Sequence, residues 1–364
     1  MNDLEESRLS IREVDRKIAS LFEERMKLCA RILEYKKANG LPIYDAEQEA
    51  RVVSDRLDSI QDPAIREYYV LFLRDMMKIS KEYQARLMYG MKIAYCGVPG
   101  AFAHIASNRV FPDAELVPYP DFSGAYRACE SGDADAVILP VENSFAGDVG
   151  GVMDLCFTGS LHINMMLELD VTQNLLGIKG ARPEDIKKVV SHPQALAQCA
   201  DYIIRRGYEA QEFENTAMAA RYVAEAGDKT LGAIASLETA ALYGLDVLEG
   251  GINSSTVNTT RFAVLSRAGN ATSVPQTDGD HFILVFTVRN EAGALAKILN
   301  IIGSHGFNMS SLHSRPVAGP LWHHYFFAEL EGSVCSENGS DLLRQLVTVC
   351  DRLKLVGSYR SLKI

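Results

Sequence analysis

One short stretch of the chain combines three side-chain types that suit a small anionic substrate. Asn258-Thr259-Thr260-Arg261-Phe262 places two hydroxyls next to a cation and an aromatic ring, at the mouth of a strand-like apolar run. A hydroxyl can give a proton, a guanidinium can fork a carboxylate, and a ring can exclude water. The same letters are also common in ordinary strands, so the stretch needs support from its surroundings.

A cation on an apolar helix face is the second candidate for chemistry. Apolar side chains recur in steps of three and four, which predicts a helix over most of residues 4–38, at positions 11, 14, 18, 21, 28, 32 and 35. Arg25 falls on the same stripe, and a buried cation requires an anion beside it. Snorkelling of Arg25 to solvent accounts for this position equally well.

Two more helices are expected before residue 90, over 46–57 and 63–89. The last should present one apolar face, formed by Ile65, Phe72, Met76, Ile79 and Tyr83. Ser80 and Gln84 lie four residues apart and share a face. Exposure to solvent is the simplest expectation for both.

The polar residues of this segment resemble the active-site pattern of the all-helical chorismate mutases, namely Arg8, Arg25, Lys36, Asp45, Glu49, Ser80 and Gln84. The resemblance implies rearrangement of chorismate to prephenate, which benefits from a clamp on two carboxylates and a donor to the ether oxygen. It assigns the carboxylates to Arg8 and Arg25, the ether oxygen to Lys36 and Gln84, and a hydroxyl to Glu49. Asp45 and Gln48 are expected beside the substrate. Gln48 stands where the family commonly has Arg, which removes one positive charge from the site.

Helix geometry separates two of these residues. Arg8 and Arg25 are 17 residues apart, or about 25 Å along a straight helix. One small substrate cannot touch both on the same helix. Either the helix breaks, or Arg8 comes from an antiparallel partner chain, and the intertwined dimer of the family favours the second possibility. We therefore expect a homodimer or a higher homo-oligomer.

Strand-like and helical stretches alternate from residue 91 onward, which indicates an α/β fold, with strands over 92–95, 136–139, 170–178, 188–191 and 231–235. Polar residues gather where strands end and helices start. Asn143 and Ser144 follow an apolar strand, while Ser191 and Thr216 precede helices. Each of these alone is most simply a helix cap or a turn residue. The Gly97–Phe102 turn leads into a helix and could bind an anion through backbone amides, but it matches no nucleotide-binding motif.

Taken together, five motifs of this segment resemble prephenate dehydratase, namely Gly97-x-Pro-Gly-Ala-Phe, Pro140-Val-Glu-Asn-Ser-x-x-Gly, Ser191-His-Pro-Gln-Ala-Leu, Asn215-Thr-Ala and Asn258-Thr-Thr-Arg-Phe. The resemblance implies two lobes, similar to type 2 periplasmic binding proteins, with prephenate between them. It also implies joint loss of carbon dioxide and the ring hydroxyl to give phenylpyruvate. Thr260 would be the proton donor, positioned by Arg261 and Phe262. The substrate-binding residues would be Asn143, Ser144, Ser191 and Thr216, with helix-start amides. Ala103 and Gln173 replace the Ser and His that are commoner in the family.

Elements in the order βαββαβ are expected after a polar linker at 269–280, and this order indicates a ferredoxin-like α+β domain. Its motifs Gly293-Ala294-Leu295 and Ser314-Arg315-Pro316 resemble those of the ACT domain of the dehydratases. In that family they line a phenylalanine pocket at a dimer interface, so phenylalanine is the expected effector. His313 replaces a commoner Glu.

Length, charge and cysteine pattern limit the remaining possibilities. The 364 residues are expected to form a multidomain protein: an all-α domain (1–90), a two-lobed α/β domain (91–268), the linker and the α+β domain (281–364). A net charge of −10 and seven scattered cysteines favour a cytoplasmic protein that binds neither nucleic acid nor membrane. The cysteines form no cluster with His that would indicate a metal site, and the reaction that the mutase resemblance implies needs no cofactor. Two alternatives stay open: a dehydratase whose mutase segment serves only dimerisation, and a regulator that binds amino acids at dead sites.

Overall fold

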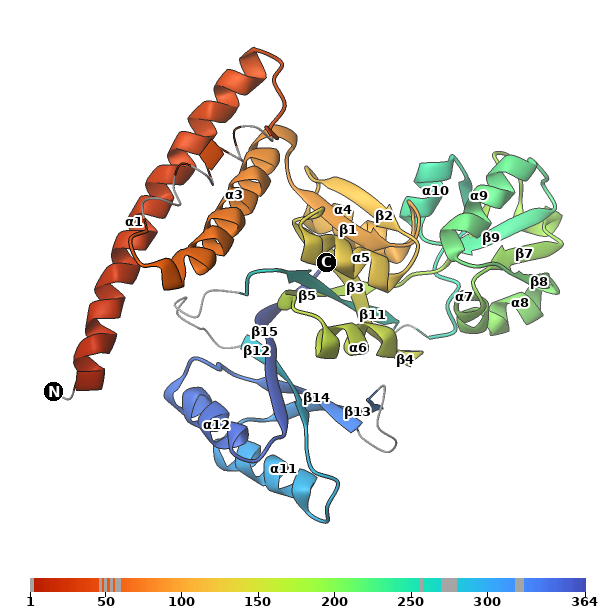
Figure 1. Ribbon diagram of the computed structural model, residues 1–364. Helices are drawn as coiled ribbons and strands as arrows, with labels where there is room; N and C mark the ends of the chain where they lie inside the picture. Colours follow the sequence, from red (N-terminus) through yellow and green to blue (C-terminus); the bar gives the residue numbers. More distant parts are fainter. Residues whose placement is uncertain are drawn as a thin grey trace. The chain divides into compact units, whose positions relative to one another are not determined.

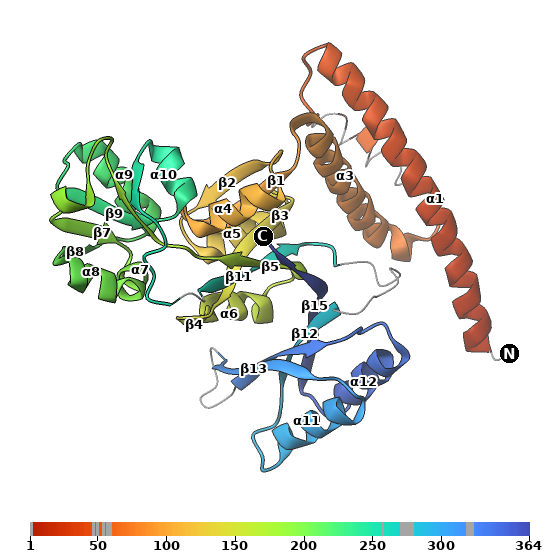
Figure 2. The same cartoon turned by 180° about the vertical axis from the view of Figure 1, so that it is seen from behind.

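The computed structural model divides the chain into two compact units, Met1–Met91 and Lys92–Ile364 (Figures 1 and 2). It describes residues 3–45, 48, 51–52, 55, 60–255, 258–269, 280–317 and 324–364. No helix in the described part of the chain is long and apolar enough to cross a membrane.

The first unit is a pair of long helices, α1 (Asp3–Ala38) and α3 (Arg66–Tyr89), with a 3-10 turn at Pro63–Ile65. Acidic residues in the first turn of α1 and lysines in its last turn match the helix dipole. The two helices pack through a narrow contact that buries Cys29 and Leu33 on α1 and Leu73 and Met77 on α3. The helices predicted over 4–38 and 63–89 are therefore present. The helix predicted over 46–57 lies mostly outside the described residues.

The faces predicted to be buried are exposed within this unit. On α1, Ile11, Ile18 and Leu21 are 60%, 47% and 64% exposed, and on α3 Phe72 is 50% exposed. Ser80 is instead buried, together with Gln84, so the expectation that both face solvent is wrong. Apolar periodicity marks a face that some partner covers, and within this unit α1 and α3 do not cover each other's stripes.

The second unit contains two lobes, each built on its own sheet (Figure 1). In the first lobe the strands run in the order β5-β11-β3-β1-β2, with β4 paired to β3. Their bounds are Lys92–Cys96 (β1), Glu115–Tyr119 (β2), Ala136–Asn143 (β3), Gly147–Asp148 (β4), His162–Asp170 (β5) and Thr259–Ser266 (β11). The helices of this lobe are α4 (Phe102–Val110), α5 (Phe122–Ser131) and α6 (Gly150–Thr158).

In the second lobe the strands run in the order β10-β6-β9-β7-β8. Their bounds are Asn174–Gly177 (β6), Lys188–Ser191 (β7), Glu209–Glu212 (β8), Leu231–Ala235 (β9) and Asp246–Glu249 (β10). A 3-10 turn lies at Pro183–Asp185, and the helices are α7 (Pro193–Gln198), α8 (Ala200–Arg206), α9 (Thr216–Ala226) and α10 (Leu237–Tyr243). The single strand predicted over 170–178 is wrong. It is divided between β5 and β6, because residues 171–173 cross from one lobe to the other.

The C-terminal part of this unit has the predicted βαββαβ order. Its elements are β12 (Asp280–Thr287), α11 (Ala294–Ser304), β13 (Met309–Pro316), β14 (His324–Glu331), α12 (Glu337–Val347) and β15 (Arg352–Lys363). The strand order β13-β14-β12-β15 confirms the ferredoxin-like fold. β15 also pairs in parallel with β5 of the first lobe, so one ten-stranded sheet runs through both parts. The linker predicted at 269–280 lies almost wholly outside the described residues.

Candidate active site

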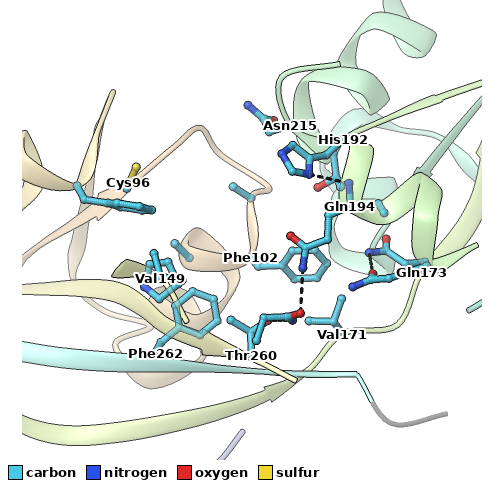
Figure 3. Close-up of a pocket in the computed structure, with 18 residues that line it drawn as sticks. Cys96, Phe102, Val149, Val171, Gln173, His192, Gln194, Asn215, Thr260 and Phe262 are labelled. Atoms are coloured by element: carbon cyan, nitrogen blue, oxygen red, sulfur yellow. Dashed lines mark hydrogen bonds between the residues drawn. The ribbon is translucent and has the colours of Figure 1, made fainter. Parts of the chain in front are cut away.

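A cavity of about 310 Å³ opens between the two lobes of the second unit (Figure 3). Strand ends from the first lobe and helix starts from both lobes form its wall. Among the described side chains that line it, none belongs to Lys, Arg, Asp or Glu; the lining polar residues are Asn143, Gln173, His192, Gln194, Gln198, Asn215, Thr216 and Thr260. An anion in this cavity must therefore be held by neutral donors.

Thr260 and Phe262 face this cavity from β11, since residues two apart on a strand share a face. The Thr260 side chain is buried, and its Oγ1 accepts a hydrogen bond from Nδ2 of Asn143 at 2.9 Å. Because Thr260 is the acceptor in this bond, its own proton remains available for a substrate oxygen. A hydrogen bond to the oxygen also favours the charged form that appears when the proton leaves.

Asn143 is held from three sides at the end of β3. Its Oδ1 accepts hydrogen bonds from the backbone N–H groups of Phe145 and Ala146, at 3.0 and 2.9 Å, and from Nε2 of Gln194 at 2.9 Å. These donors identify Oδ1, so the amide nitrogen must face Thr260. The turn after β3 therefore orients the side-chain amide of Asn143 so that its nitrogen donates to Thr260.

A chain of buried amides continues from Asn143. Its Nδ2 also reaches Oδ1 of Asn258 at 3.3 Å, and Asn258 and Gln198 exchange bonds at 2.9 and 3.3 Å. Gln173 donates to Oε1 of Gln198 at 3.3 Å. No donor among the described residues reaches the buried Oε1 of Gln173. Gln173 and Asn258 lie in the two segments that cross between the lobes. The series of hydrogen-bonded amides therefore connects both crossing segments with Thr260.

Two helix N-termini border the cavity. Ala101, Phe102 and Ala103 begin α4 in the first lobe, and Asn215 and Thr216 begin α9 in the second. The N-termini of helices of this length carry partial positive charge and bind carboxylates. Thr216 therefore lies where the substrate-binding prediction needs it.

Cys96 is the one thiol on the cavity wall among the described residues. Burial raises the pKa of this thiol to about 11, and the charge of Asp121 adds to the effect. A thiol that stays protonated at neutral pH is a poor nucleophile. The cavity therefore offers a hydroxyl proton donor rather than a thiolate.

The structure places Arg261 on the opposite face of β11, away from the cavity. Its guanidinium forks the carboxylate of Glu329 on β14 at 2.6 and 2.8 Å, and contacts Glu142 at 3.2 Å. Arg261, which was expected to position Thr260, therefore does not line the cavity, and its guanidinium binds carboxylates of the protein itself. Strand alternation is the reason, since Thr260 and Phe262 occupy the other face.

Two of the predicted substrate-binding residues do not line the cavity. The hydroxyl of Ser144 accepts a hydrogen bond from the Thr259 amide at 2.9 Å. The buried hydroxyl of Ser191 donates to the carbonyl of Ile234 at 2.6 Å and so ties β7 to β9. The Ser191 hydroxyl gives its proton to a bond within the protein, whereas the exposed Ser144 hydroxyl only accepts a bond and does not use its own proton there.

In the first unit, Arg25 is brought together with two of its predicted neighbours. Its guanidinium donates to Ser80 and lies 3.7 Å from the sulfur of Cys29. Gln84 donates from the facing helix to the Cys29 carbonyl at 2.9 Å. Arg25, Ser80 and Gln84 therefore form one polar cluster inside the helix pair.

The other predicted mutase residues lie away from this cluster. Lys36 donates to the Ile43 carbonyl at 2.6 Å, Arg8 is exposed near the start of α1, and Asp45 accepts from the Gln48 amide at 3.0 Å. Glu49 lies outside the described residues. Since Arg8 and Arg25 occupy one unbroken helix, the alternative of a break between them is excluded.

A second cavity, also about 310 Å³, lies in the C-terminal part beside α11. Ala294, Leu295 and Ser314 line it, and Gly293 caps the helix with a φ of +84°. Arg315 instead points to the first lobe, where it pairs with both carboxylate oxygens of Asp154 at 2.8 and 2.7 Å. Pro316, which is exposed, ends β13. Ala294, Leu295 and Ser314 thus remain candidates for effector binding.

The site contains residues that the sequence analysis did not select. Gln194 and Gln198 both line the cavity from α7. Their spacing of four residues in an Ala-rich helix was the available signal, because it puts two amides on one helix face. Asn258 directly precedes the Thr-Thr-Arg-Phe stretch.

Comparison with known proteins assigns each segment of the chain to a family. Residues 7–85 match the family chorismate mutase type II, residues 93–270 match prephenate dehydratase, and residues 282–333 match the ACT domain. The bifunctional chorismate mutase/prephenate dehydratase of Aquifex aeolicus is 31% identical, over 99% of this chain and 98% of its own. Arogenate dehydratase/prephenate dehydratase 1 of Arabidopsis thaliana is 30% identical, over 86% of this chain and 83% of its own.

A solved structure resembles the second unit. Prephenate dehydratase from Arthrobacter aurescens, in complex with L-Phe, superposes with a TM-score of 0.69 at 28% identity and covers 74% of this chain and 90% of its own. The three families match in this order along one polypeptide, and the likeness to the Aquifex protein extends over nearly the full chain. The chain belongs to the bifunctional chorismate mutase/prephenate dehydratase family.

Proposed function

We propose that the helical unit converts chorismate to prephenate and that the cavity of the second unit converts prephenate to phenylpyruvate. Family membership supports both activities. One observation carries the dehydratase assignment: the Thr260 hydroxyl accepts a hydrogen bond from Asn143 in a cavity that two helix N-termini reach. This arrangement supplies a proton donor and a carboxylate dock, which are what the reaction requires.

The dehydration can be followed bond by bond. Helix-start amides at Phe102 and Thr216 hold the carboxylates, and the ring hydroxyl lies against Thr260. The bond from the ring to its carboxylate breaks and releases carbon dioxide, and its electron pair enters the ring. The bond from the opposite ring carbon to its hydroxyl breaks, and the leaving oxygen takes the Thr260 proton to form water. The Asn143 amide stabilises the resulting alkoxide until solvent returns the proton.

Removal of the Thr260 hydroxyl tests this assignment. Thr260→Ala should lower the dehydratase kcat by about 10²- to 10⁴-fold, the usual range for a lost general acid. Chorismate turnover should stay at the wild-type rate, since the two sites share no residue. Separate assays of chorismate consumption and phenylpyruvate formation measure both effects.

Thr260→Ser is the matched control, because it keeps the hydroxyl and should keep most of the activity. Equal loss of both activities in Thr260→Ala would contradict separate sites. Phenylpyruvate formation without chorismate turnover in the wild type would mean that the helical unit serves dimerisation alone. Failure of both reactions, with amino-acid binding intact, would identify a regulator with dead sites.

The mutase site is proposed to need a second chain. Arg25, Ser80 and Gln84 form its core, and the exposed apolar stripe of α1 would dock against the same stripe of a partner. An antiparallel partner would bring its own Arg8 to this cluster, as the spacing of Arg8 and Arg25 requires. The protein is therefore proposed to be a homodimer.

Phenylalanine is the proposed effector, bound at the second cavity. Leu295 and Phe326 supply apolar contacts, and Asn290 and Ser314 supply polar groups for the ammonium and carboxylate. If phenylalanine binds one conformation of the second unit better than another, it shifts the equilibrium toward that conformation of the cleft. The structure of a relative bound to L-Phe supports this proposal.

A further inference from the structure

Gln194 reaches across the cavity from one lobe to the other. It lies in the first turn of α7 in the second lobe, and its Nε2 donates to Oδ1 of Asn143 on β3 in the first lobe, at 2.9 Å. Both side chains line the cavity, and Figure 3 shows Gln194 pointing toward Thr260. The hydrogen bond therefore exists only while the lobes are together.

Two consecutive hydrogen bonds run in the same direction toward Thr260. Gln194 donates to the carbonyl of Asn143, and the amide nitrogen of Asn143 donates to the Thr260 hydroxyl. A donor bound to an amide carbonyl draws electron density from its nitrogen, so the N–H on the far side becomes a stronger donor. The series ends on the oxygen that carries negative charge once its proton has left.

The direction of this series does not depend on an arbitrary choice of amide orientation. Backbone N–H groups of Phe145 and Ala146 both donate to Oδ1 of Asn143, which makes that atom the oxygen. Gln194 must then present its nitrogen, since two carbonyl oxygens would repel each other. The polarity of the series is thus set by the backbone.

Other contacts hold the lobes together on the same side of the fold. Thr239 on α10 donates to the Gly100 carbonyl at 2.8 Å, and Tyr243 donates to the Pro99 carbonyl at 2.9 Å. Pro99 and Gly100 lie in the turn before α4, which lines the cavity. The α10 contacts and the Gln194–Asn143 bond thus both join the two lobes.

We propose that Gln194 is a positioning residue for the dehydration, which acts through Asn143 to make Thr260 a competent acid when the lobes close. A free threonine hydroxyl is a very weak acid. A series of hydrogen bonds that ends on its oxygen stabilises the alkoxide and so makes the hydroxyl a stronger acid. The inference rests on the proposed function, because it assigns Thr260 the proton transfer. It adds that the donor is assembled from both lobes.

Two substitutions at Gln194 separate this role from a structural one. Gln194→Met removes the donor and should lower the dehydratase kcat about tenfold, equally at every pH, with KM nearly unchanged because helix N-termini hold the carboxylates. Gln194→Glu places an anion against Oδ1 of Asn143 at pH 8 and should lower kcat further, about a hundredfold. A protonated glutamate is again a donor, so its kcat should rise toward that of the wild type as the pH falls toward about 5.

The controls use the same purified protein. Gln211→Met and Gln211→Glu, at an exposed position on β8 of the same lobe, should leave both the rate and its pH profile unchanged. Chorismate turnover in each Gln194 variant reports the amount of enzyme, and the thermal unfolding of the second unit reports whether that unit is folded. The inference would be overturned if Gln194→Met kept the wild-type kcat or changed only KM. It would also be overturned if the pH profile of kcat in Gln194→Glu ran parallel to that of the wild type. If the wild type itself fails to convert prephenate, the proposed function is at fault instead.

Discussion

Arg261 and Thr260 are neighbours in the sequence, yet they serve opposite faces of one strand. The Glu329 side chain that Arg261 forks is only 5% exposed, and Tyr359 donates to the same carboxylate at 2.6 Å. Burial acts to raise the pKa of Glu329, but the bonds from Arg261 and Tyr359 outweigh it and hold this pKa below its ordinary value. The pair therefore stabilises the contact between β11 and β14.

Removal of the cation should be costly, because it leaves a buried carboxylate unpaired. Arg261→Met should lower the free energy of unfolding at pH 7.5 by roughly 3–5 kcal/mol. The double variant Arg261→Met/Glu329→Met should recover much of this loss, since no buried charge remains. Urea denaturation followed by the signal of the second unit measures both. A double variant as unstable as the single one would contradict the argument.

The same pair predicts how stability depends on pH. In the wild type the folded-state pKa of Glu329 is depressed, so its stabilisation is present above the unfolded value of about 4.3 and is lost as the pH falls below it. In Arg261→Met this pKa should be raised, so the variant loses stability as the pH rises from about 5 to 7. The difference between the two proteins should thus widen with pH. A constant difference would show that the pairing is not the cause.

Sequence reasoning identified which residues lie near the site better than it identified where they point. Thr260, Phe262, Asn143 and Thr216 do line one cavity. Arg261 does not, because a motif carries no information on which strand face borders the cleft. The hydroxyl of Ser191 looks identical in sequence to a ligand donor, and only the fold shows that it already donates to a backbone carbonyl.

At the scale of elements, β13 presents two different faces. Ser314 lines the proposed effector cavity, while the residues on either side point to the first lobe. Arg315 pairs with Asp154 on α6, and His313 contacts Asp148 on β4 at 2.6 Å. The hydrogen bond from Arg315 holds the pKa of Asp154 below its usual value. Val149, which follows Asp148 in the chain, lines the active-site cavity, so β13 is linked to that cavity through Asp148.

Loss of this connection should weaken regulation more than catalysis. Arg315→Gln should raise the phenylalanine concentration needed for half inhibition of the dehydratase about tenfold, which is within the usual range of coupling energies. Uninhibited kcat should stay within about twofold, since Arg315 does not reach the cavity. Inhibition curves and calorimetric titration with phenylalanine separate coupling from binding.

Arg344→Gln is the control for Arg315→Gln, because Arg344 is an exposed arginine on α12 whose described contacts, with Asp341 and the Ser340 carbonyl, stay within its own helix. It should leave inhibition unchanged. An unaltered inhibition curve in Arg315→Gln would show that β13 does not carry the signal.

Helix faces illustrate why periodicity alone misleads. Ile11, Ile18 and Phe72 were predicted to be buried, yet they are exposed within the first unit. A stripe of this kind indicates contact with some partner. Sequence periodicity cannot tell whether that partner is the neighbouring helix or a second chain.

At the scale of the whole molecule, the exposed apolar face of α1 suggests a test of whether each mutase site uses residues from two chains. If each mutase site uses Arg25 from one chain and Arg8 from the other, Arg8→Ala and Arg25→Ala homodimers should both be nearly inactive. After unfolding and refolding together in equal amounts, half of the dimers are mixed, and each mixed dimer has one intact site. Mutase activity should therefore return to about one quarter of the wild-type value.

Dehydratase activity in the same mixture serves as the control and should not change. Light scattering gives the mass of the assembly and should show a dimer. Absence of recovery on mixing, with the dimer intact, would place both arginines in a site built from a single chain.

The order of the three segments was evident from their motifs, and their folds follow the predicted classes. The sequence did not show that the dehydratase and C-terminal segments share one sheet, because no local pattern predicts that β15 pairs with β5. Gly357 permits this pairing, since a Cβ there would collide with the backbone of Ile163. Glycine in a strand has several possible causes, so only the neighbouring strand reveals this one.

This pairing also has a consequence for synthesis on the ribosome. Thr260 and the rest of β11 emerge from the exit tunnel long before β15, yet Ser361 and Leu362 are the residues that complete the hydrogen bonding of β5 beside them. During translation the catalytic lobe must therefore wait with one strand edge unprotected. A nascent chain stalled within α12 would already contain every residue of the dehydratase cavity and still lack the strand that closes its sheet.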